Sequence, residues 1–376
     1  MFDPSALFNH KTDGDMKKNQ WVKFGIGIDV SKDKLHVCFG GVTENQSFKI
    51  IAQRRFSNAE GGHKELLAWL NQKRKDASCE WLIVLEVTGV YHEQVLHYLH
   101  KAGIPVCLEL AKRTKHFFKS IGQDSKNDKL DGRGLSRYAC ERTGLRIWEP
   151  VSEHIYEIRS LLRHRAALVT SRTQYRNQLH AYEHSAYSVK PLLRSLEKLI
   201  GELNKEIEKM ERKALTLAKK DPELYRKVMQ IVDSLPGVGL LTVLLTVGET
   251  NGFKAFSSEK QLTSYAGYDI IENQSGTKAG KTKISKRGNK RIRSQLYMAA
   301  STAIRVKAEP FYNLYERVFL RSGGVYRKAN VAVQRKLLLM MYTLWKKDEP
   351  FDPEYYKLEK AKKEVAPICI EATLDS

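Results

Sequence analysis

Four acidic residues in the N-terminal part of the chain have the types and positions that metal-dependent phosphoryl transfer requires. Asp29 follows the apolar run FGIGI, and Glu86 ends the run WLIVLE. Asp128 and Asp131 lie three residues apart in NDKLD, with Asp124 as a lower-ranked neighbour. Carboxylates beside apolar runs are costly to bury unless a cation compensates them, and residues three apart share one face of a helix. We therefore predict a site for one or two Mg²⁺ ions, which prefer carboxylate oxygens and in pairs stabilise the attacking and leaving oxygens of phosphoryl transfer.

Each of these residues alone is typical of a turn or a solvated helix face, so the elements that carry them decide the interpretation. Runs rich in β-branched and aromatic residues, separated by turn residues, predict three antiparallel strands, after which helices and strands alternate. This order predicts a mixed α/β sheet of the ribonuclease H-like kind, with acidic residues on two strands and one helix. We expect strands at 24–30, 34–39, 48–56, 81–87 and 105–110, and helices at 59–72, 91–101 and 129–141.

A long helical segment follows, from Ile155 to about Ala218, with Pro191 as a break between two helices. Apolar residues in its second half recur in steps of three and four, which is the pattern of a coiled-coil seam. They are Leu196, Leu199, Leu203, Ile207, Met210, Ala214 and Leu217. We expect the seam to support a homo-oligomer, a dimer or a tetramer. The alternative is a helical hairpin that packs on its own chain.

The charge of the chain favours a polyanionic partner. Its 64 Lys and Arg residues against 43 Asp and Glu give a formal charge of +21, and phosphates that neutralise cations release counterions. Between positions 278 and 293 no acidic residue interrupts the cations, which are Lys278, Lys281, Lys283, Lys286, Arg287, Lys290, Arg291 and Arg293. We expect them to bind a phosphate backbone; a solvated basic surface is the alternative. Arginines between positions 159 and 176 extend the prediction to the first long helix.

Two glycines, Gly237 and Gly239 of the motif LPGVG, precede an apolar helix. This arrangement resembles a helix-hairpin-helix turn, whose backbone N–H groups can approach a phosphate. The cations bind charge without reading bases, and we find neither a zinc finger nor a recognition helix. The five scattered cysteines predict neither a zinc site nor a disulfide framework. No apolar run reaches the roughly 20 residues that cross a bilayer, so we expect a cytoplasmic protein, close to the nucleoid and away from the membrane.

Together these motifs resemble the DEDD transposases of the insertion-sequence-110 family and the related Piv-type DNA invertases. The resemblance covers roughly residues 24–345 and rests on GIDVSKDKLHV, LEVTGVY, NDKLDGRGLS, LPGVGLLTVLLTVGE, SYAGYDI and SGTKAGKTKISKRGNKRIRSQLYMAA. It implies a RuvC-like domain that holds the four acidic residues and a C-terminal transposase domain with a nucleophilic serine. It also implies donor and target DNA as substrates, chosen by a structured noncoding guide RNA, called a bridge RNA, that the element encodes.

The resemblance assigns the nucleophile to Ser275, which stands in an S-G pair before the basic stretch. Thr277 and, more distantly, Ser285 are alternatives, because the segment after the pair is one residue shorter than in some relatives. Attack by the serine, activated by the bound ions, would leave a covalent phosphoserine that conserves the bond for rejoining. In the family, the serine and the acidic cluster of one site come from different subunits.

Five regions are expected: a flexible leader (1–20), a RuvC-like DEDD domain (21–150), a helical coiled-coil linker (151–222), a mainly helical transposase domain with the serine (223–347) and a charged tail (348–376). Two other functions fit parts of the sequence. A RuvC-like nuclease would use the same carboxylates with water and would need no serine. A non-catalytic, basic nucleic-acid-binding protein would keep its affinity after all four carboxylates became amides.

Overall fold

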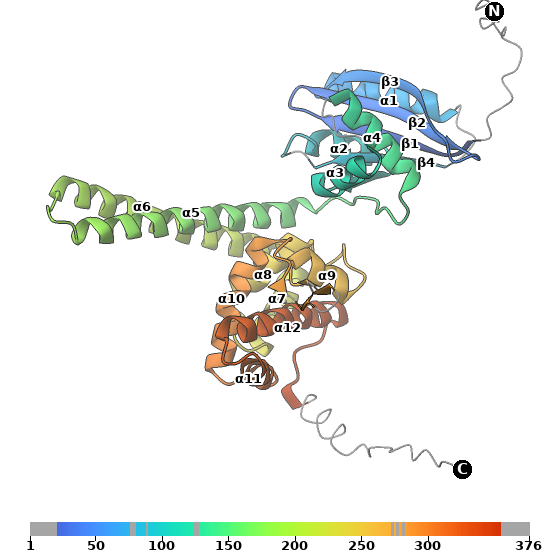
Figure 1. Cartoon of the computed structure of the whole chain (residues 1–376). Coiled ribbons are helices and arrows are strands. Elements are labelled where there is room, and N and C mark those ends of the chain that lie inside the picture. The colour runs from blue at the N-terminus through green and yellow to red at the C-terminus, as the bar shows by residue number, and fades with distance from the viewer. Residues whose placement is uncertain are drawn as a thin grey trace, which may run out of the picture. The chain divides into compact units, whose positions relative to one another are not determined.

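A computed structural model describes most of the chain, namely residues 21–75, 80–87, 89–122, 128–271, 274–275, 278–279 and 283–354. Two compact units divide it, Met1–Pro150 and Val151–Ser376. The first is a mixed sheet with helices and the second is built mostly of helices (Figure 1), so the predicted fold class is confirmed. Within the described ranges, every helix is too short or too polar to cross a membrane.

The first unit is organised around a five-stranded sheet in the order β3-β2-β1-β4-β5. β1, β2 and β3 pair antiparallel, whereas β4 pairs parallel to β1 and β5 parallel to β4. Parallel neighbours need a crossover, and here a helix lies between each pair of them along the chain. The ribonuclease H-like order expected from the sequence is confirmed. The strands are β1 (Trp21–Val30), β2 (Lys34–Thr43), β3 (Phe48–Ser57), β4 (Trp81–Glu86) and β5 (Val106–Glu109).

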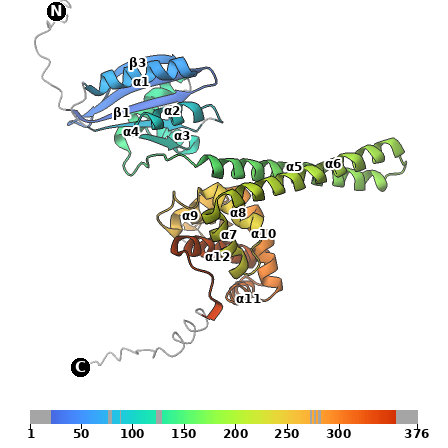
Figure 2. The same cartoon turned by 180° about the vertical axis from the view of Figure 1, so that it is seen from behind.

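Helices cover both faces of this sheet (Figure 2). Alternate side chains of β1, such as Ile26 and Ile28, share a core with α1 and α2. The opposite face carries Val84 and Cys107, which pack with α3 and α4. The helix α3 was not predicted, because its sequence AKRTKHFFKS is polar except for its two phenylalanines. The helices are α1 (Glu60–Lys75), α2 (Glu93–Lys101), α3 (Ala111–Ser120) and α4 (Asp128–Glu141).

Two glycines of β1 allow α4 to approach the strand backbone directly. A Cβ at Gly27 would lie 2.3 Å from the carbonyl oxygen of Gly132 and equally close to the amide nitrogen of Ser136. At Gly25, the carbonyl oxygen accepts a hydrogen bond of 2.7 Å from the Ser136 hydroxyl. Any larger side chain would push the helix off the sheet. The glycines therefore fix the first turns of α4 beside the C-terminal half of β1.

The second unit begins with two long helices, α5 and α6, which lie side by side as an antiparallel hairpin (Figure 1). Ser152 caps the first of them, and Pro191 stands in the first turn of the second, where a missing N–H costs nothing. In the described part of this unit, six shorter helices form the remaining core. The helices are α5 (Glu153–Glu183), α6 (Lys190–Lys220), α7 (Pro222–Ser234), α8 (Leu240–Thr250), α9 (Glu259–Ala266), α10 (Lys290–Arg305), α11 (Phe311–Arg321) and α12 (Tyr326–Lys347).

The hairpin buries most of the predicted coiled-coil seam within one chain. Leu196, Ile207, Met210 and Ala214 are buried, whereas Leu199 is 37% exposed. The alternative interpretation, a hairpin packed on its own chain, therefore accounts for much of the apolar stripe. The homo-oligomer stays a prediction.

Candidate active site

Asp29 and Glu86 lie next to each other at the C-terminal ends of two parallel strands. Ile28 of β1 is in register with Leu85 of β4, so the following residues of both strands are neighbours. Successive side chains of a strand alternate between faces. Because Gly27 and Val84 contact the α4 side of the sheet, both carboxylates point to that side. Both are half-buried.

The first turn of α4 brings the DxxD pair to the same face. Asp131 is half-buried and precedes Gly132, which contacts both β1 and β2. Asp128 begins the helix, and the structure describes its backbone only; Asp124 lies outside the described residues. Three of the four predicted carboxylates thus share one face and one end of the sheet.

Buried groups around Glu86 were missed from the sequence. The hydroxyl of Thr114, a fully buried residue of α3, donates a hydrogen bond to Glu86 Oε2. Glu109 ends β5 in register with Glu86 and is buried, with Arg113 at 3.5 Å. A strand ending in an acidic residue, VCLE, was the available signal for Glu109. Thr114 had none, because the helix that carries it was not predicted.

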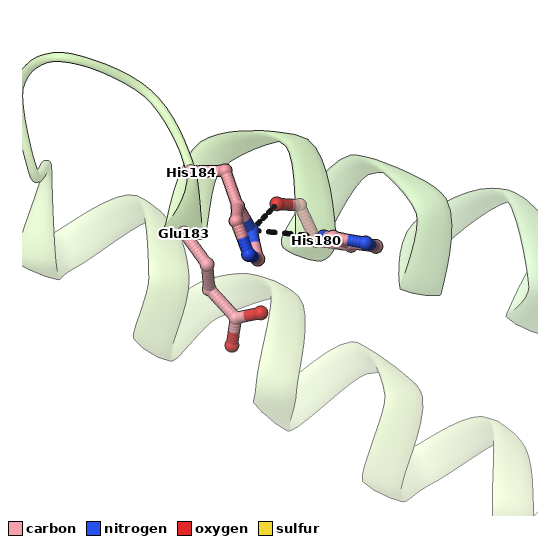
Figure 3. Close-up of side chains that lie close together, drawn as sticks. All are labelled: His180, Glu183 and His184. Atoms are coloured by element: carbon pink, nitrogen blue, oxygen red, sulfur yellow. Dashed lines mark hydrogen bonds between the residues drawn. The ribbon is translucent and has the colours of Figure 1, made fainter.

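The donor set at this end of the sheet fits a hard cation, since carboxylate oxygens are what Mg²⁺ prefers. A different group, His180, Glu183 and His184, is gathered more tightly: within the described residues, it alone brings three ligand atoms within 4.8 Å of one another. It lies exposed at the end of α5 (Figure 3), where the His184 Nδ1 is 2.8 Å from the backbone oxygen of His180. Imidazole suits zinc or nickel rather than Mg²⁺, so this group does not compete for the phosphoryl-transfer site.

Short strands, where the sequence predicted a loop, carry the candidate nucleophile. Ser275 belongs to β7 (Gln274–Ser275), which pairs with β8 (Lys278–Ala279), and the structure describes its backbone. The strands that flank this pair in the sequence, β6 (Ile270–Ile271) and β9 (Lys283–Ile284), form a second antiparallel pair. We call residues 268–287 the serine hairpin. Gly276, Thr277 and Lys281 lie outside the described residues, and the alternative Ser285 follows the second pair of strands.

Most described cations of the basic stretch are exposed and form no ion pair with another described side chain. These are Lys283, Lys286, Arg287, Lys290 and Arg291. Arg293 differs, because its guanidinium donates to the backbone oxygens of Ala266 at 2.7 Å and Lys286 at 3.1 Å. Arg293 therefore holds the base of the serine hairpin, and phosphate binding by the other five stays a prediction.

A buried carboxylate, Glu249 of α8, links three elements at this base. Arg163 of α5 donates two hydrogen bonds to it, of 2.7 and 2.8 Å, and Asn289 Nδ2 donates a third of 2.7 Å. The hydroxyl of Tyr265 donates to the Glu249 backbone oxygen at 2.8 Å. Asn289 also caps α10. The network therefore ties the start of α10, where the serine hairpin ends, to the long helix α5.

Three arginines of α5, a helix expected to contact nucleic acid, have partners within the protein, and that expectation stays a prediction. Arg163 pairs with Glu249, Arg165 with Glu211, and Arg172 donates to the Asn204 side chain at 2.9 Å. The acidic residue inside the apolar helix LLTVLLTVGET was the sequence signal for the first pair.

We expect Glu249→Gln to destabilise the protein by about 2 kcal/mol at neutral pH, because charge-assisted bonds are lost while Arg163 stays partly solvated. Burial alone would raise the pKa of Glu249, but the bonds from Arg163 and Asn289 outweigh it and lower that pKa below its ordinary value of 4.5. A lowered folded-state pKa contributes stability above pH 4.5, and this contribution is lost as the pH falls through the folded-state pKa.

Urea unfolding of both proteins between pH 3.5 and pH 7 (both chosen around the ordinary carboxyl pKa of roughly 4) measures this difference. The gap in free energy of unfolding should be largest at pH 7 and shrink in the acid range. Glu316→Gln, a change at an exposed position of α11, is the control. A gap that grows on acidification would contradict the role assigned to Glu249.

The LPGVG turn has a packing role at one of its two glycines. Gly237 has a φ of +81°, and a Cβ there would lie 2.7 Å from the Ala299 backbone oxygen of α10. Gly239 caps α8, is exposed and has open space around it. Gly239 lies exposed at the start of α8, and the phosphate contact predicted for both glycines stays a prediction.

Two family models match the chain. A profile of IS110-type DEDD transposases, described as "Transposase", matches residues 26–184, and one described as "Transposase IS116/IS110/IS902 family" matches residues 229–316. The chain belongs to the IS110 family of transposases. The first match contains Asp29, Glu86, Asp128 and Asp131, and the second contains Ser275.

This transposase is similar to curated proteins along most of its length. It is 27% identical over 344 residues to the pilin gene-inverting protein of Moraxella lacunata, covering 88% of this chain and 98% of that one. It is 26% identical over 355 residues to the transposase for insertion sequence element IS1111A of Coxiella burnetii, covering 87% and 90%. Among solved structures, Thermus thermophilus RuvC is similar at 14% identity with a TM-score of 0.24, covering 30% of this chain and 90% of that one.

Proposed function

We propose that this transposase cuts and rejoins DNA strands with Ser275 as nucleophile and with Mg²⁺ held by Asp29, Glu86, Asp128 and Asp131. The observation that carries the proposal is the placement of Asp29, Glu86 and Asp131 on one face and one end of a ribonuclease H-like sheet. The family membership of both parts of the chain supports the pairing of this site with a serine.

Each residue has a defined task in this reaction. Bound Mg²⁺ would neutralise charge on the scissile phosphate and ease deprotonation of the nucleophile. Ser275 Oγ attacks phosphorus and forms a phosphoserine ester, and its proton passes to solvent. The P–O bond to the departing sugar breaks, and the sugar oxygen takes a proton from solvent to leave as a hydroxyl. Attack by the hydroxyl of another strand then reverses these changes: a new phosphodiester forms and Ser275 is released. Thr114 holds the Glu86 carboxylate in place throughout.

The exposed cations of the basic stretch would hold donor and target DNA, and a guide RNA would choose the sequences. Lysines and arginines bind backbones without reading bases, which leaves base recognition to another molecule. We further propose a homo-oligomer, in which the carboxylates of one subunit serve the serine of another. The nuclease alternative keeps one supporting observation, because the carboxylate site lies wholly within the first unit.

The test uses the full-length protein, copurified RNA and labelled DNA that spans one end of the element. In Mg²⁺, we expect a cut strand that stays attached to denatured protein, joined to a peptide containing Ser275. Chelation of the metal should abolish the product. Cut strands free of protein would favour the nuclease, and binding without any cut would favour the non-catalytic protein. Sequencing of the copurified RNA tests the guide.

A further inference from the structure

A pocket of about 240 Å³ lies in the first unit, beside the carboxylate site. Its walls come from β2, β3 and the first turn of α4, and the residues that line it are His36, Val37, Cys38, Gln53, Arg54, Arg55 and Gly132. The helix α4 packs on β1, β2 and β4, whereas residues 53–55 of the edge strand β3 are exposed. The pocket therefore opens to solvent at the sheet edge.

Strand register places this pocket in line with Asp29. His36 of β2 pairs with Asp29 on one side and with Arg55 on the other. Directly opposed residues of paired strands point to the same face, so Arg55 points to the face that carries the acidic residues. Two strand spacings separate Asp29 from Arg55, a backbone distance of about 10 Å.

The pocket is cationic. Arg55 forms no ion pair with another described side chain, and its exposed guanidinium carries a full charge. Arg133 of α4 does not line the pocket, but it follows the lining residue Gly132 and its charge acts on Cys38. Burial raises the pKa of Cys38, and the charge of Arg133 opposes that rise. The Arg133 Nε is buried and has no hydrogen-bond partner among the described residues. A charged donor without an acceptor is costly to bury, so an anion bound next to Arg133 would lower that cost.

The geometry points to a binding site for one phosphate of the DNA strand that passes the carboxylates, with Arg55 as its principal ligand. This inference rests on the proposed function, which supplies the strand. A duplex strand rises 3.4 Å per nucleotide, so the distance from Asp29 places this phosphate within about three nucleotides of the scissile one. Arg55 would thus position the strand, because it holds a phosphate close to the one that reacts.

The neighbouring residue provides a matched control. Arg54 pairs with Val37, a core residue of the opposite face, and its side chain lies over Phe56 and 3.9 Å from Glu65 of α1. Arg54 therefore lines the pocket with backbone atoms only. Arg54→Ala and Arg55→Ala remove the same charge from adjacent positions on opposite faces, and thermal unfolding should show that both proteins fold.

We expect Arg55→Ala to raise the KM for DNA cleavage about tenfold, the effect of one lost charge-assisted hydrogen bond, with kcat nearly unchanged. Arg54→Ala should match the wild type, and Arg55→Lys should recover part of the loss. A set of DNA substrates, each with one phosphate near the cut replaced by a neutral methylphosphonate, identifies the phosphate that is bound. Replacement at one position should raise the KM of the wild type by about as much as Arg55→Ala does. That position should have no further effect on Arg55→Ala, because the two changes remove one contact.

Equal KM values for Arg54→Ala and Arg55→Ala would overturn the phosphate site while leaving the proposed function intact. The phosphate site is also wrong if every methylphosphonate that raises the KM of the wild type raises the KM of Arg55→Ala by the same factor. If the wild type makes no cut in Mg²⁺, the proposed function fails, and mobility-shift binding of the same DNA set still decides the site. Binding of Arg55→Ala that equals that of Arg54→Ala on every DNA would then overturn the phosphate site as well.

Discussion

Asp29→Asn should reduce DNA cleavage by on the order of a thousandfold, the loss of several kcal/mol expected when a metal ligand is removed. The amide keeps the size of the side chain but removes the charge that binds the cation. Because Asp29 lies beside Glu86 at the strand ends, the change leaves the sheet core and the basic stretch untouched. Binding of nucleic acid should therefore stay within about twofold of the wild type, since that affinity comes from cations.

Cleavage is measured on labelled element-end DNA in Mg²⁺, and binding by mobility shift. Asp33→Asn is the matched control, because Asp33 is exposed in the turn that follows β1. This variant should cleave DNA at the wild-type rate. Cleavage by Asp29→Asn at the wild-type rate would remove Asp29 from the metal site. Parallel loss of cleavage and binding would indicate a folding defect, which circular dichroism would reveal.

Ser275→Ala should be inactive alone, but should regain cleavage when mixed with Asp29→Asn. In the proposed oligomer, the serine of one subunit works with the carboxylates of another. A mixed dimer therefore contains one site with both groups intact and one with neither. If subunits pair at random, half of the dimers are mixed, and in each mixed dimer one of the two sites is intact. We therefore expect roughly a quarter of the wild-type activity.

The mixture is assayed after joint refolding or coexpression, with each variant alone as the blank. Only the Asp29→Asn subunit should become attached to DNA, since it alone keeps the nucleophile; a size tag on one variant identifies it. Adducts on neither subunit, despite active wild type, would contradict the shared site. Ser285→Ala tests the alternative serine and should keep its activity, because Ser285 follows the second pair of strands of the hairpin.

The sequence was sufficient for the succession of three antiparallel strands followed by alternating helices and strands, and for placing acidic residues on two of the strands and one helix. Turn residues separate the strands clearly, and the period of two in β1 and β4 decides which face each side chain takes. What the sequence did not reveal depends on which distant segments meet. Thr114 lies on a helix whose many polar residues obscure the apolar pattern of its buried side in the sequence. Its hydrogen bond to Glu86 joins residues 28 positions apart.

The partners of the α5 arginines also lie far away in the sequence, so they could not be predicted from it. A run of cations on a helix is typical of a nucleic-acid surface, and nothing local shows that Arg163 meets Glu249, 86 residues later. The serine hairpin was interpreted as a loop because two-residue strands are too short to leave a period. Arg293 looked like its neighbours in sequence, and only its two backbone acceptors distinguish it.

The closed base of the serine hairpin has a consequence for how such proteins diverge. The two ends of the hairpin meet at the helical core. The backbone N–H of Asn289 donates to the backbone oxygen of Tyr265 at 2.7 Å, and a Cβ at Gly288 would lie 2.4 Å from that oxygen. Once the ends of a loop are held together, doubling its length costs only about 0.6 kcal/mol. We therefore expect the core to tolerate insertions and deletions between β6 and β9, so that this segment can be exchanged as a unit without loss of the helical fold.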